Sequence, residues 1–520
     1  MSRKIITASA CFAALLFCTT AAHTVAQQYH PAPLGVHAHL NIDVAIKEYK
    51  EYRKSTENPE DERTWLRGLY QGMFENNPGL SGITFGIYWD RIQKNDPDCA
   101  LSHDCLPGTD ANGNDWSYLD DVFTEAKAQN KTVILLITPG FNSPQWIFDR
   151  LSPSCDPLFG PVLIRRVPNC GKVTFAKFPE KSHADGDVLP LPWNATYQFW
   201  WQQFLSELND RYSNHKEFAA IAIAGPNGAS SEMILPTTAD GSTQSPGEPA
   251  DKAWSRLIGN SFPLAPDGYE TSDQVFVEAW ESAIMAYEGI FTNVTLFLTP
   301  DNGDAMPEFG DTLVEGDPGP LFLEDCSTAT QYPLSCQAKT DILSYFLATQ
   351  DGLQLGTTVG GMTAVSPVTP QAGDRGIGLG GVKILTSLPW PSPPILGGSE
   401  FDWSVTEDAE IRRHEGCTKS EKGTPQCKNI SVEEAAYNVL GVYFYGTEFA
   451  TEYGATADGS APIQWLDIDY RDIVWAQTNG ATPNNGTPCN QSLQDLINGA
   501  SWYLFTIDGK TPPVAPPSCM

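Results

Sequence analysis

Basic residues are scarce in this sequence relative to acidic ones. The 520 residues include 32 Lys and Arg against 63 Asp and Glu, which gives a formal net charge of −31. Nucleic-acid binding requires clustered Lys and Arg against the phosphates, and the same imbalance disfavours anionic membrane surfaces and acidic polysaccharides. We therefore expect no nucleic-acid partner and a neutral ligand.

Long apolar runs are absent after the first residues. No stretch beyond residue 26 approaches the ~20 apolar residues of a membrane-spanning helix, so we expect no membrane insertion. At the start of the chain, Arg3 and Lys4 precede an apolar stretch at residues 5–17 and a small-x-small triplet at 24–26. This layout predicts a signal peptide at residues 1–26 and secretion, or a periplasmic location in a bacterium. We also expect the protein to be a monomer. A membrane anchor is the alternative, with an apolar core too short to span comfortably.

The motifs of several cofactor and enzyme classes are missing. No G-x-G-x-x-G or Walker loop follows an apolar run, and no G-x-S-x-G elbow of a serine hydrolase is present. No cysteine pair has C-x-x-C spacing beside a histidine cluster, and His37 with His39 would need a third ligand to hold a metal. We therefore expect neither a cofactor nor a metal.

Ten of the twelve cysteines fall into five close pairs along the chain. Cys11 and Cys18 lie in the expected signal peptide, and each of the five pairs stands among Pro, Gly, Asp, Asn or Ser. In an exported protein this spacing predicts five local disulfides that close surface loops. The pairs are Cys99/Cys105, Cys155/Cys170, Cys326/Cys336, Cys417/Cys427 and Cys489/Cys519. Six N-x-S/T triplets would also permit N-glycans in a eukaryote, at Asn130, Asn194, Asn293, Asn429, Asn485 and Asn490.

Short apolar, β-branched runs alternate with longer helical or irregular stretches. This alternation predicts parallel strands joined by helical crossovers. The runs are residues 34–40, 83–89, 132–138, 219–224, 294–299, 355–361, 394–398 and 463–468, and helical patterns occupy 116–128, 197–212, 274–291 and 432–444. We expect an α/β fold, a (β/α)8 TIM barrel over residues 27–478 with 479–520 packed on it as an extension. An open doubly wound sheet is the alternative.

Polar and aromatic residues follow these runs, where a TIM barrel builds its active site. Carboxylates and carboxamides there would hydrogen-bond sugar hydroxyls, and indoles would stack on sugar faces. The expected substrate-binding residues are His39, Trp89, Arg91, Trp146, Asn227, Asp301, Trp403 and Trp465.

Cleavage of a glycosidic bond needs two carboxyl groups. One protonates the departing oxygen, and the other attacks the anomeric carbon or activates water. Glu232 follows the fourth run and Glu400 the seventh, on roughly opposite sides of an eight-stranded barrel. We predict that these two are the catalytic carboxylates. Asp301, Asp304, Asp402 and Glu448 are substitutes if a strand is misplaced.

The layout resembles the clan of retaining (β/α)8 glycosidases, with an acid/base on strand four and a nucleophile on strand seven. Residues 138–146, which end in Ser143-Pro144-x-Trp146, resemble the strand-three loop of barrel β-galactosidases. The resemblance implies that Glu232 is the acid/base and Glu400 the nucleophile. It also implies that Arg91 orients the nucleophile and that Trp465 lies under the sugar.

The sequence departs from the clan's pattern beside the acid. Ser231 stands where the clan usually has Asn, and Gly225-Pro226-x-Gly228 is loosely similar to the acid-bearing loop of β-amylases, which invert. Two alternatives to a retaining hydrolase therefore stay open: an inverting hydrolase and a catalytically inactive, glycan-binding barrel.

Overall fold

The computed structural model describes about half of the chain. The described residues are 30–102, 105–151, 153–154, 170–174, 188–226, 228, 272–298, 382–388, 395–400, 463–478, 492–507 and 509–516. The strand expected at 355–361 and the helix expected at 432–444 lie outside them, as does the expected signal peptide.

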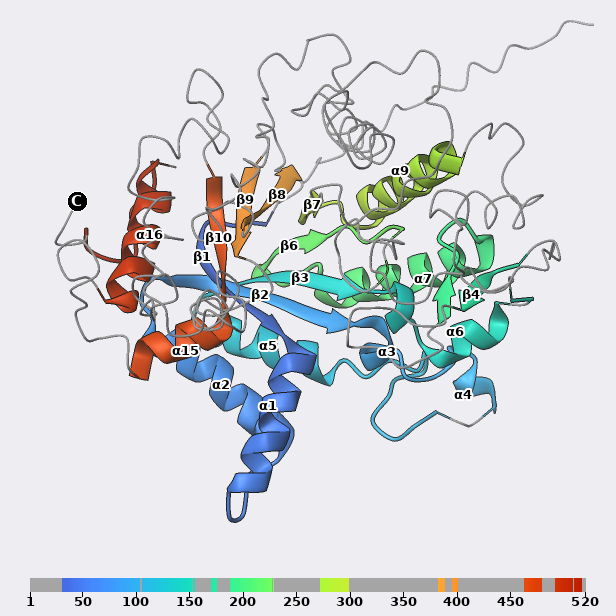
Figure 1. Ribbon diagram of the computed structural model, residues 1–520, viewed down its shortest axis with the longest axis horizontal. Coiled ribbons are helices and arrows are strands. Elements are labelled where there is room, and N and C mark those ends of the chain that lie inside the picture. The colour runs from blue at the N-terminus through green and yellow to red at the C-terminus, as the bar shows by residue number, and fades with distance from the viewer. Residues whose placement is uncertain are drawn as a thin grey trace, which may run out of the picture.

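A curled, mainly parallel sheet forms the centre of the fold (Figure 1). Its strands pair in the order β1-β10-β9-β8-β7-β6-β3-β2, and β2 pairs back to β1. They are β1 (Gly35–Asn41), β2 (Leu80–Tyr88), β3 (Thr132–Thr138), β6 (Phe218–Ala222), β7 (Thr295–Leu298), β8 (Val382–Leu388), β9 (Ile395–Glu400) and β10 (Ile463–Asp469). Seven of them coincide with runs expected from the sequence, so the α/β class and the parallel curled sheet are confirmed.

One strand departs from the expected (β/α)8 repeat. β8 was not expected, and it runs antiparallel to both of its neighbours, β7 and β9. Only residues 389–394 separate β8 from β9, whereas a parallel connection needs a dozen or more residues. The expectation of eight parallel strands is therefore wrong at this position, and the described residues form the TIM-barrel pattern only in part.

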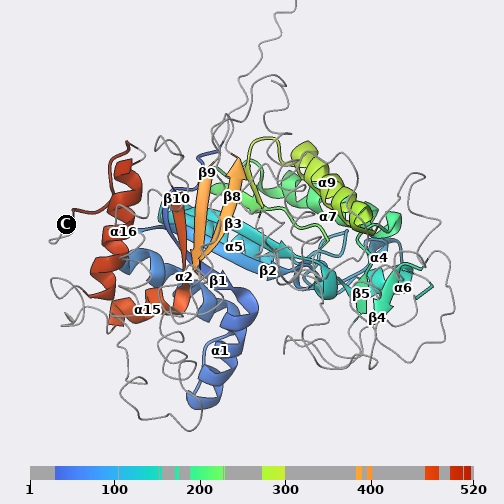
Figure 2. The same ribbon diagram turned by 45° about the horizontal axis from the view of Figure 1, so that its top comes forward.

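Helices cover the outside of the sheet. They include α1 (Ile42–Ser55), α2 (Glu62–Asn76), α5 (Ser117–Ala128), α7 (Ala195–Tyr212), α9 (Ser272–Ile290), α15 (Tyr470–Thr478) and α16 (Leu493–Ile507). α5, α7 and α9 confirm three expected helices. α7 and α9 lie side by side, and β8, β9 and β10 are adjacent (Figure 2). α16 packs near the starts of β1 and β2, where Phe505 approaches Gly35 and Asn498 approaches Gly79.

Three shorter helices and a small hairpin complete the described elements. The helices are α3 (Trp89–Ile92), α4 (Cys99–Ser102) and α6 (Gln145–Arg150), and a 3-10 turn, η1, spans Gly140–Asn142. The hairpin pairs β4 (Lys172–Thr174) with β5 (Val188–Pro190). The domain boundaries expected at residues 26 and 478 stay predictions.

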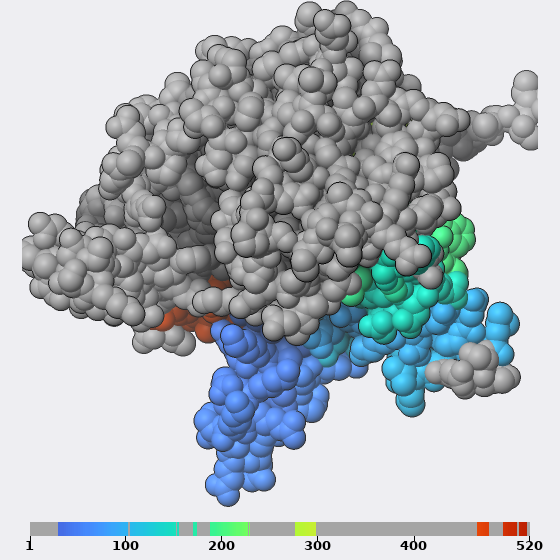
Figure 3. All heavy atoms as spheres, turned by 45° about the vertical axis from the view of Figure 1, so that its right-hand side comes forward, coloured from blue at the N-terminus to red at the C-terminus, as the bar shows by residue number. Residues whose placement is uncertain are grey.

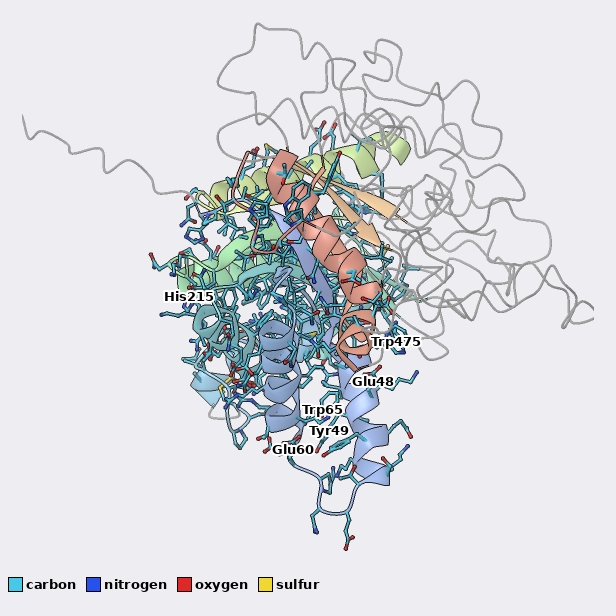
Figure 4. The ribbon with its side chains drawn as sticks, turned by 90° about the vertical axis from the view of Figure 1, so that its left-hand side faces the viewer. Glu48, Tyr49, Glu60, Trp65, His215 and Trp475 are labelled. Carbon is cyan, nitrogen blue, oxygen red and sulfur yellow. A yellow bond between two sulfur atoms is a disulfide. The ribbon has the colours of Figure 1, made fainter. Side chains whose placement is uncertain are left out.

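Two helices after β1 form a hairpin that extends away from the rest (Figure 3). The Asn41 carboxamide caps α1, and the Asp61 carboxylate caps α2 by accepting from the Thr64 N–H. Between the helices, the rings of Tyr49 and Trp65 lie 5.7 Å apart (Figure 4). α2 is fixed to α5 through Arg63, which donates two hydrogen bonds of 2.8 Å to the buried Asp121 carboxylate. The hairpin is thus fixed to α5 through α2.

Side chains alternate between two cores along the strands. Residues such as Phe85 and Leu135 face outward into the large core under the helices. A separate cluster of Ile134, Ala220, Ala222, Phe297 and Trp465 lies on the other face, inside the curled sheet. Such an alternation is what strands covered on both faces require.

Gly82 lets β1, β2 and β3 approach closely inside the sheet. A Cβ at this position would collide with the Thr132 carbonyl oxygen and lie 2.7 Å from His37 Cδ2. We expect Gly82→Ala to lower the free energy of unfolding by about 1–3 kcal/mol, the usual cost of overpacking. Urea unfolding checks this, with Gly72→Ala as the control: a Cβ on Gly72 in α2 meets nothing within 4 Å, so a gain of about 0.5–1 kcal/mol is expected. Equal effects at both positions would contradict the prediction.

One expected disulfide is described with both of its cysteines, and a second expected pair with only one of its two. Cys99 and Cys105 are bonded, and Cys170 is disulfide-bonded as well. The other expected pairs, like the sequons at Asn429, Asn485 and Asn490, lie outside the described residues. Among the described helices, none is long and apolar enough to cross a membrane.

Candidate functional site

Two loops expected to carry the chemistry meet at the carboxyl ends of β3 and β6. The Phe141 N–H, in the loop after β3, donates to the Gly228 carbonyl in the loop after β6 (2.9 Å). Gly225, at the start of that second loop, packs so closely on Trp280 of α9 that a Cβ would lie 2.5 Å from its ring. The segment that leads to Glu232 is therefore held on both sides, although Glu232 itself lies outside the described residues.

The loop after β3 has a fixed conformation. Gly140 has a positive φ of 69°, which favours glycine, and begins η1. Its carbonyl accepts from the Ser143 N–H (3.1 Å) and the Ser143 hydroxyl (2.8 Å). Its N–H donates to the hydroxyl of Tyr197 on α7 (3.3 Å), whose pKa burial raises to about 12. Tyr197 therefore stays protonated and neutral near neutral pH.

Trp89 is the centre of an aromatic cluster behind the carboxyl ends of β2 and β3. Its ring is fully buried and lies 6.1 Å from Trp146, 4.9 Å from Trp201 and 5.7 Å from Phe204. Its Nε1 donates to Gln93 Oε1 (2.9 Å). Trp89 thus packs behind the loops, and its expected contact with a sugar stays a prediction.

At the ends of β1 and β2 a charged pair fixes the start of α1. Arg91 of α3 forms an ion pair with Asp43, in the first turn of α1. The same turn is capped by Asn41 at the end of β1. The described partner of Arg91 is therefore Asp43, and its expected effect on Glu400 is untested.

Polar residues occupy the inside of the sheet below the loops. Asp467 of β10 is fully buried and accepts a 2.6 Å hydrogen bond from the hydroxyl of Thr84 on β2. His37 of β1, which pairs in register with Asp467, shares a 2.9 Å hydrogen bond with the Thr132 hydroxyl. Burial raises the pKa of Asp467 to about 7 and lowers the pKa of His37 to about 3. Near pH 6 both groups are therefore mainly uncharged.

Stability should depend on pH through Asp467. The pKa of Asp467 is higher in the folded state than the ordinary 3.8. The contribution of this group to the free energy of unfolding is therefore complete below pH 4 and is lost as the pH rises to about 7. At about 1.4 kcal/mol per pKa unit, the loss across this window is of the order of 4 kcal/mol. We expect wild type to lose this much relative to Asp467→Asn between about pH 4 and pH 7 in urea unfolding. Parallel pH profiles for the two proteins would contradict a buried, protonated Asp467.

The residues expected to bind substrate fall into three groups: buried, partly exposed, and outside the described residues. Trp89, Trp146 and Trp465 are buried, Trp465 inside the sheet with its ring 5.9 Å from that of Phe297. His39 and Arg91 are partly exposed at the carboxyl ends of β1 and β2. Asn227, Asp301 and Trp403 lie outside the described residues, as do the substitute acids Asp301, Asp304, Asp402 and Glu448.

Glu400 is the last residue of β9, so its backbone is at the carboxyl end of the parallel sheet. Its neighbour Ser399 pairs in register with Asp467 of β10. β9 and β6 are three steps apart in the order of strands, with β8 and β7 between them. The end of β9 and the loop after β6 thus lie at separate places along the edge formed by the carboxyl ends of the parallel strands.

The site residues expected from the sequence did not include the polar pair inside the sheet or one buried loop residue. Thr84 and Asp467 sit at inward positions of strands otherwise dominated by apolar residues, a signal that the period of two makes visible. Asn142 is 5% exposed, although it lies in a loop rich in glycine and proline. Within the described ranges no three His, Cys, Asp or Glu side chains are arranged to hold a metal ion.

Known proteins resemble this chain only weakly. No protein-family model and no curated protein matches it. Among solved structures, it is similar over 51% of its length to a polyextremophilic beta-galactosidase from the Antarctic haloarchaeon Halorubrum lacusprofundi, with 11% identity and a TM-score of 0.28. It is similar over 55% of its length to a beta-galactosidase from Bacillus circulans sp. alkalophilus, with 11% identity and a TM-score of 0.26. The chain spans 36% and 41% of the lengths of these two proteins.

Proposed function

We propose that this protein is a secreted glycoside hydrolase that cleaves O-glycosidic bonds of a neutral oligosaccharide or polysaccharide by a retaining mechanism. Glu232 is the acid/base and Glu400 the nucleophile. The N-terminal pattern and the Cys99–Cys105 disulfide support export to an oxidising compartment. The net charge of −31 supports a neutral substrate.

The observation that carries the proposal is the arrangement of the carboxyl ends. Glu400 ends β9, and the loop that leads to Glu232 is fixed at Gly228 by the Phe141 N–H. Active sites of parallel barrels are built on this edge, from residues that follow different strands. Two carboxylates from two separate strands can there approach one sugar from opposite sides.

The reaction follows from two carboxyl groups in different protonation states. The Glu400 carboxylate attacks the anomeric carbon while the Glu232 carboxyl gives its proton to the departing oxygen, so one alcohol leaves and a glycosyl ester forms. Glu232, now a carboxylate, takes a proton from water, and the oxygen of that water displaces Glu400 from the anomeric carbon. The products are two hydroxyl-bearing fragments with the original anomeric configuration.

A panel of neutral glycans tests the proposal. Wild type is incubated with α- and β-linked gluco-, galacto-, manno- and xylo-oligosaccharides, and the first-formed anomer is followed by proton NMR. We expect cleavage of at least one glycan with retained configuration. Cleavage with inverted configuration would contradict Glu400 as a nucleophile, because an inverting enzyme needs its carboxyl groups ~6.5–9.5 Å apart with water between them. Binding without any cleavage would instead favour the inactive, glycan-binding barrel.

A further inference from the structure

Three of the N-x-S/T triplets, or sequons, begin at an asparagine whose side chain is described, and these asparagines differ in exposure. Asn130 is exposed, whereas Asn194 and Asn293 are partly buried. An N-linked glycan is a bulky surface group, and it replaces one of the two hydrogens on the asparagine Nδ2. The folded protein can therefore carry a glycan only where Nδ2 has open space and is not needed as a donor.

Asn130 lies in the turn between α5 and β3. Its N–H donates to the Lys127 carbonyl (3.3 Å), and the Lys131 N–H donates to the Ala126 carbonyl (2.8 Å). These two bonds form a Schellman motif at the end of α5. Asn130 takes the left-handed position of the motif with a φ of 52°, a conformation in which asparagine is enriched. The backbone of the turn thus holds Asn130 without using its side chain.

The residues on either side of Asn130 are bound to neighbouring elements, and Asn130 itself is not. The Gln129 carboxamide donates to Glu75 of α2 (3.2 Å), and the Lys131 ammonium donates to the Leu80 carbonyl at the start of β2. The carboxamide of Asn130 forms no hydrogen bond to the described residues. Its Nδ2 is therefore the most accessible of the three.

Asn293 uses both hydrogens of its carboxamide inside the fold. Its Nδ2 donates to the Ser213 carbonyl (2.8 Å) and lies 3.2 Å from Nε2 of His30. These contacts join the segment before β7 to the end of α7 and to the residues before β1. A glycan on Asn293 would break one of them, so this sequon is closed in the folded protein.

Asn194 is the N-cap of α7. Its Oδ1 accepts from the N–H groups of Thr196 (3.0 Å) and Tyr197 (3.1 Å). With Oδ1 held there, Nδ2 lies over Gly171, where a Cβ would be only 3.0 Å from it. A sugar on this nitrogen would displace the chain at Gly171, so the second partly buried sequon is closed as well.

We propose that Asn130 is an N-glycosylation site and that, of the three described sequons, it alone carries a glycan. This inference rests on the proposed secretion and not on the hydrolase activity. The donor is an oligosaccharide linked to a lipid diphosphate. Nδ2 loses a proton and forms a bond to the anomeric carbon of the donor, the bond from that carbon to the diphosphate oxygen breaks, and the lipid diphosphate leaves.

The transfer takes place before β3 joins the sheet. Thr132, the third residue of the sequon, shares a 2.9 Å hydrogen bond with the fully buried His37 in the folded protein. Asn130 precedes the first residue of β3, so its glycan stands at the amino end of the strands. With ~3.3 Å per residue, the seven residues of β3 place it roughly 20 Å from the loop at the carboxyl end. The glycan therefore leaves the proposed active site open.

Peptide mapping of protein made in a eukaryotic host tests the site. The full chain is expressed with its own N-terminus and, in parallel, with a host leader fused ahead of Met1. N-glycans are removed with an amidase in heavy-oxygen water, which converts each glycosylated asparagine into a labelled aspartate. Mass spectrometry then reads each sequon separately, because three others lie outside the described residues. We expect label at Asn130 and none at Asn194 or Asn293.

Two variants separate the glycan from the fold. Asn130→Gly should remove the label, and it should match deglycosylated wild type in melting temperature, because glycine also suits the left-handed position. Its kcat and KM should equal those of wild type. Asn293→Ala is the control: it should leave the label at Asn130 and lower the melting temperature, since the bonds to Ser213 and His30 are lost.

An unlabelled Asn130 in exported protein would refute the site. Equal label at Asn130 and Asn293 would refute the selection among the sequons by the fold. If only the form with the host leader is exported and is labelled at Asn130, the proposed secretion fails while the glycosylation site stands. The reading requires no glycan cleavage, so an inactive protein decides the question equally well.

Discussion

Replacing Glu232 by Gln is expected to reduce kcat on a glycan with a poor leaving group by roughly 10²- to 10⁴-fold, the contribution typical of a positioned general acid. Gln has nearly the same shape but cannot give up a proton. The loss should be much smaller on an aryl glycoside with an acidic phenol, because that leaving group departs without protonation. Initial rates on the two substrates check this difference.

Glu400→Gln should lose at least as much activity, and on both substrates, because the nucleophile is needed whatever the leaving group. Glu60→Gln is the control for both variants, since Glu60 is exposed in the turn between α1 and α2. Azide should restore cleavage to a small variant such as Glu400→Ala by taking the place of the carboxylate. Wild-type rates in either Gln variant would remove that residue from the catalytic pair.

Trp89→Ala is expected to have the largest effect on stability, with a loss of about 3–5 kcal/mol in the free energy of unfolding. Trp89 is fully buried at the centre of the aromatic cluster. Its removal leaves a cavity that the surrounding rings, fixed to α6 and α7, fill only in part. A loss of this size is a large share of the stability of an ordinary domain.

Trp65→Ala provides the comparison for Trp89. Trp65 is only partly buried between α1 and α2 (Figure 4), so its truncation removes fewer contacts and should cost clearly less. Urea unfolding followed by circular dichroism measures both losses. Equal losses would mean that Trp89 does not hold the cluster together.

Most strands could be predicted because a strand covered on both faces has a distinctive sequence. β3, the run TVILLIT, was located to the residue, since nothing but β-branched and apolar side chains fits between two cores. β8, the run VKILTSL, was missed because the expectation of parallel crossovers left no place for a hairpin. The short gap of residues 389–394 was the available signal, since it permits only antiparallel pairing.

The side-chain environments around the candidate site were harder to predict than the positions of the strand ends. The ends of β2, β3 and β6 were placed to within two residues, but the sequence could not tell a tryptophan that faces a ligand from one that faces a core. Trp89 and Trp465 prove to be fully buried, the first behind the loops and the second inside the sheet. Which face a residue takes after the strand ends depends on long-range packing, such as that of Trp201 and Phe204 on α7.

The identity of the nucleophile is the most direct test of this account. Wild type is incubated with a 2-deoxy-2-fluoro glycoside of the sugar it cleaves, which slows hydrolysis of a glycosyl ester, and the digested protein is examined by mass spectrometry. We expect one covalent adduct, on the peptide that contains Glu400, and none in Glu400→Gln. An adduct on a different carboxylate, or turnover with inverted product and no adduct, would contradict a retaining mechanism at Glu400.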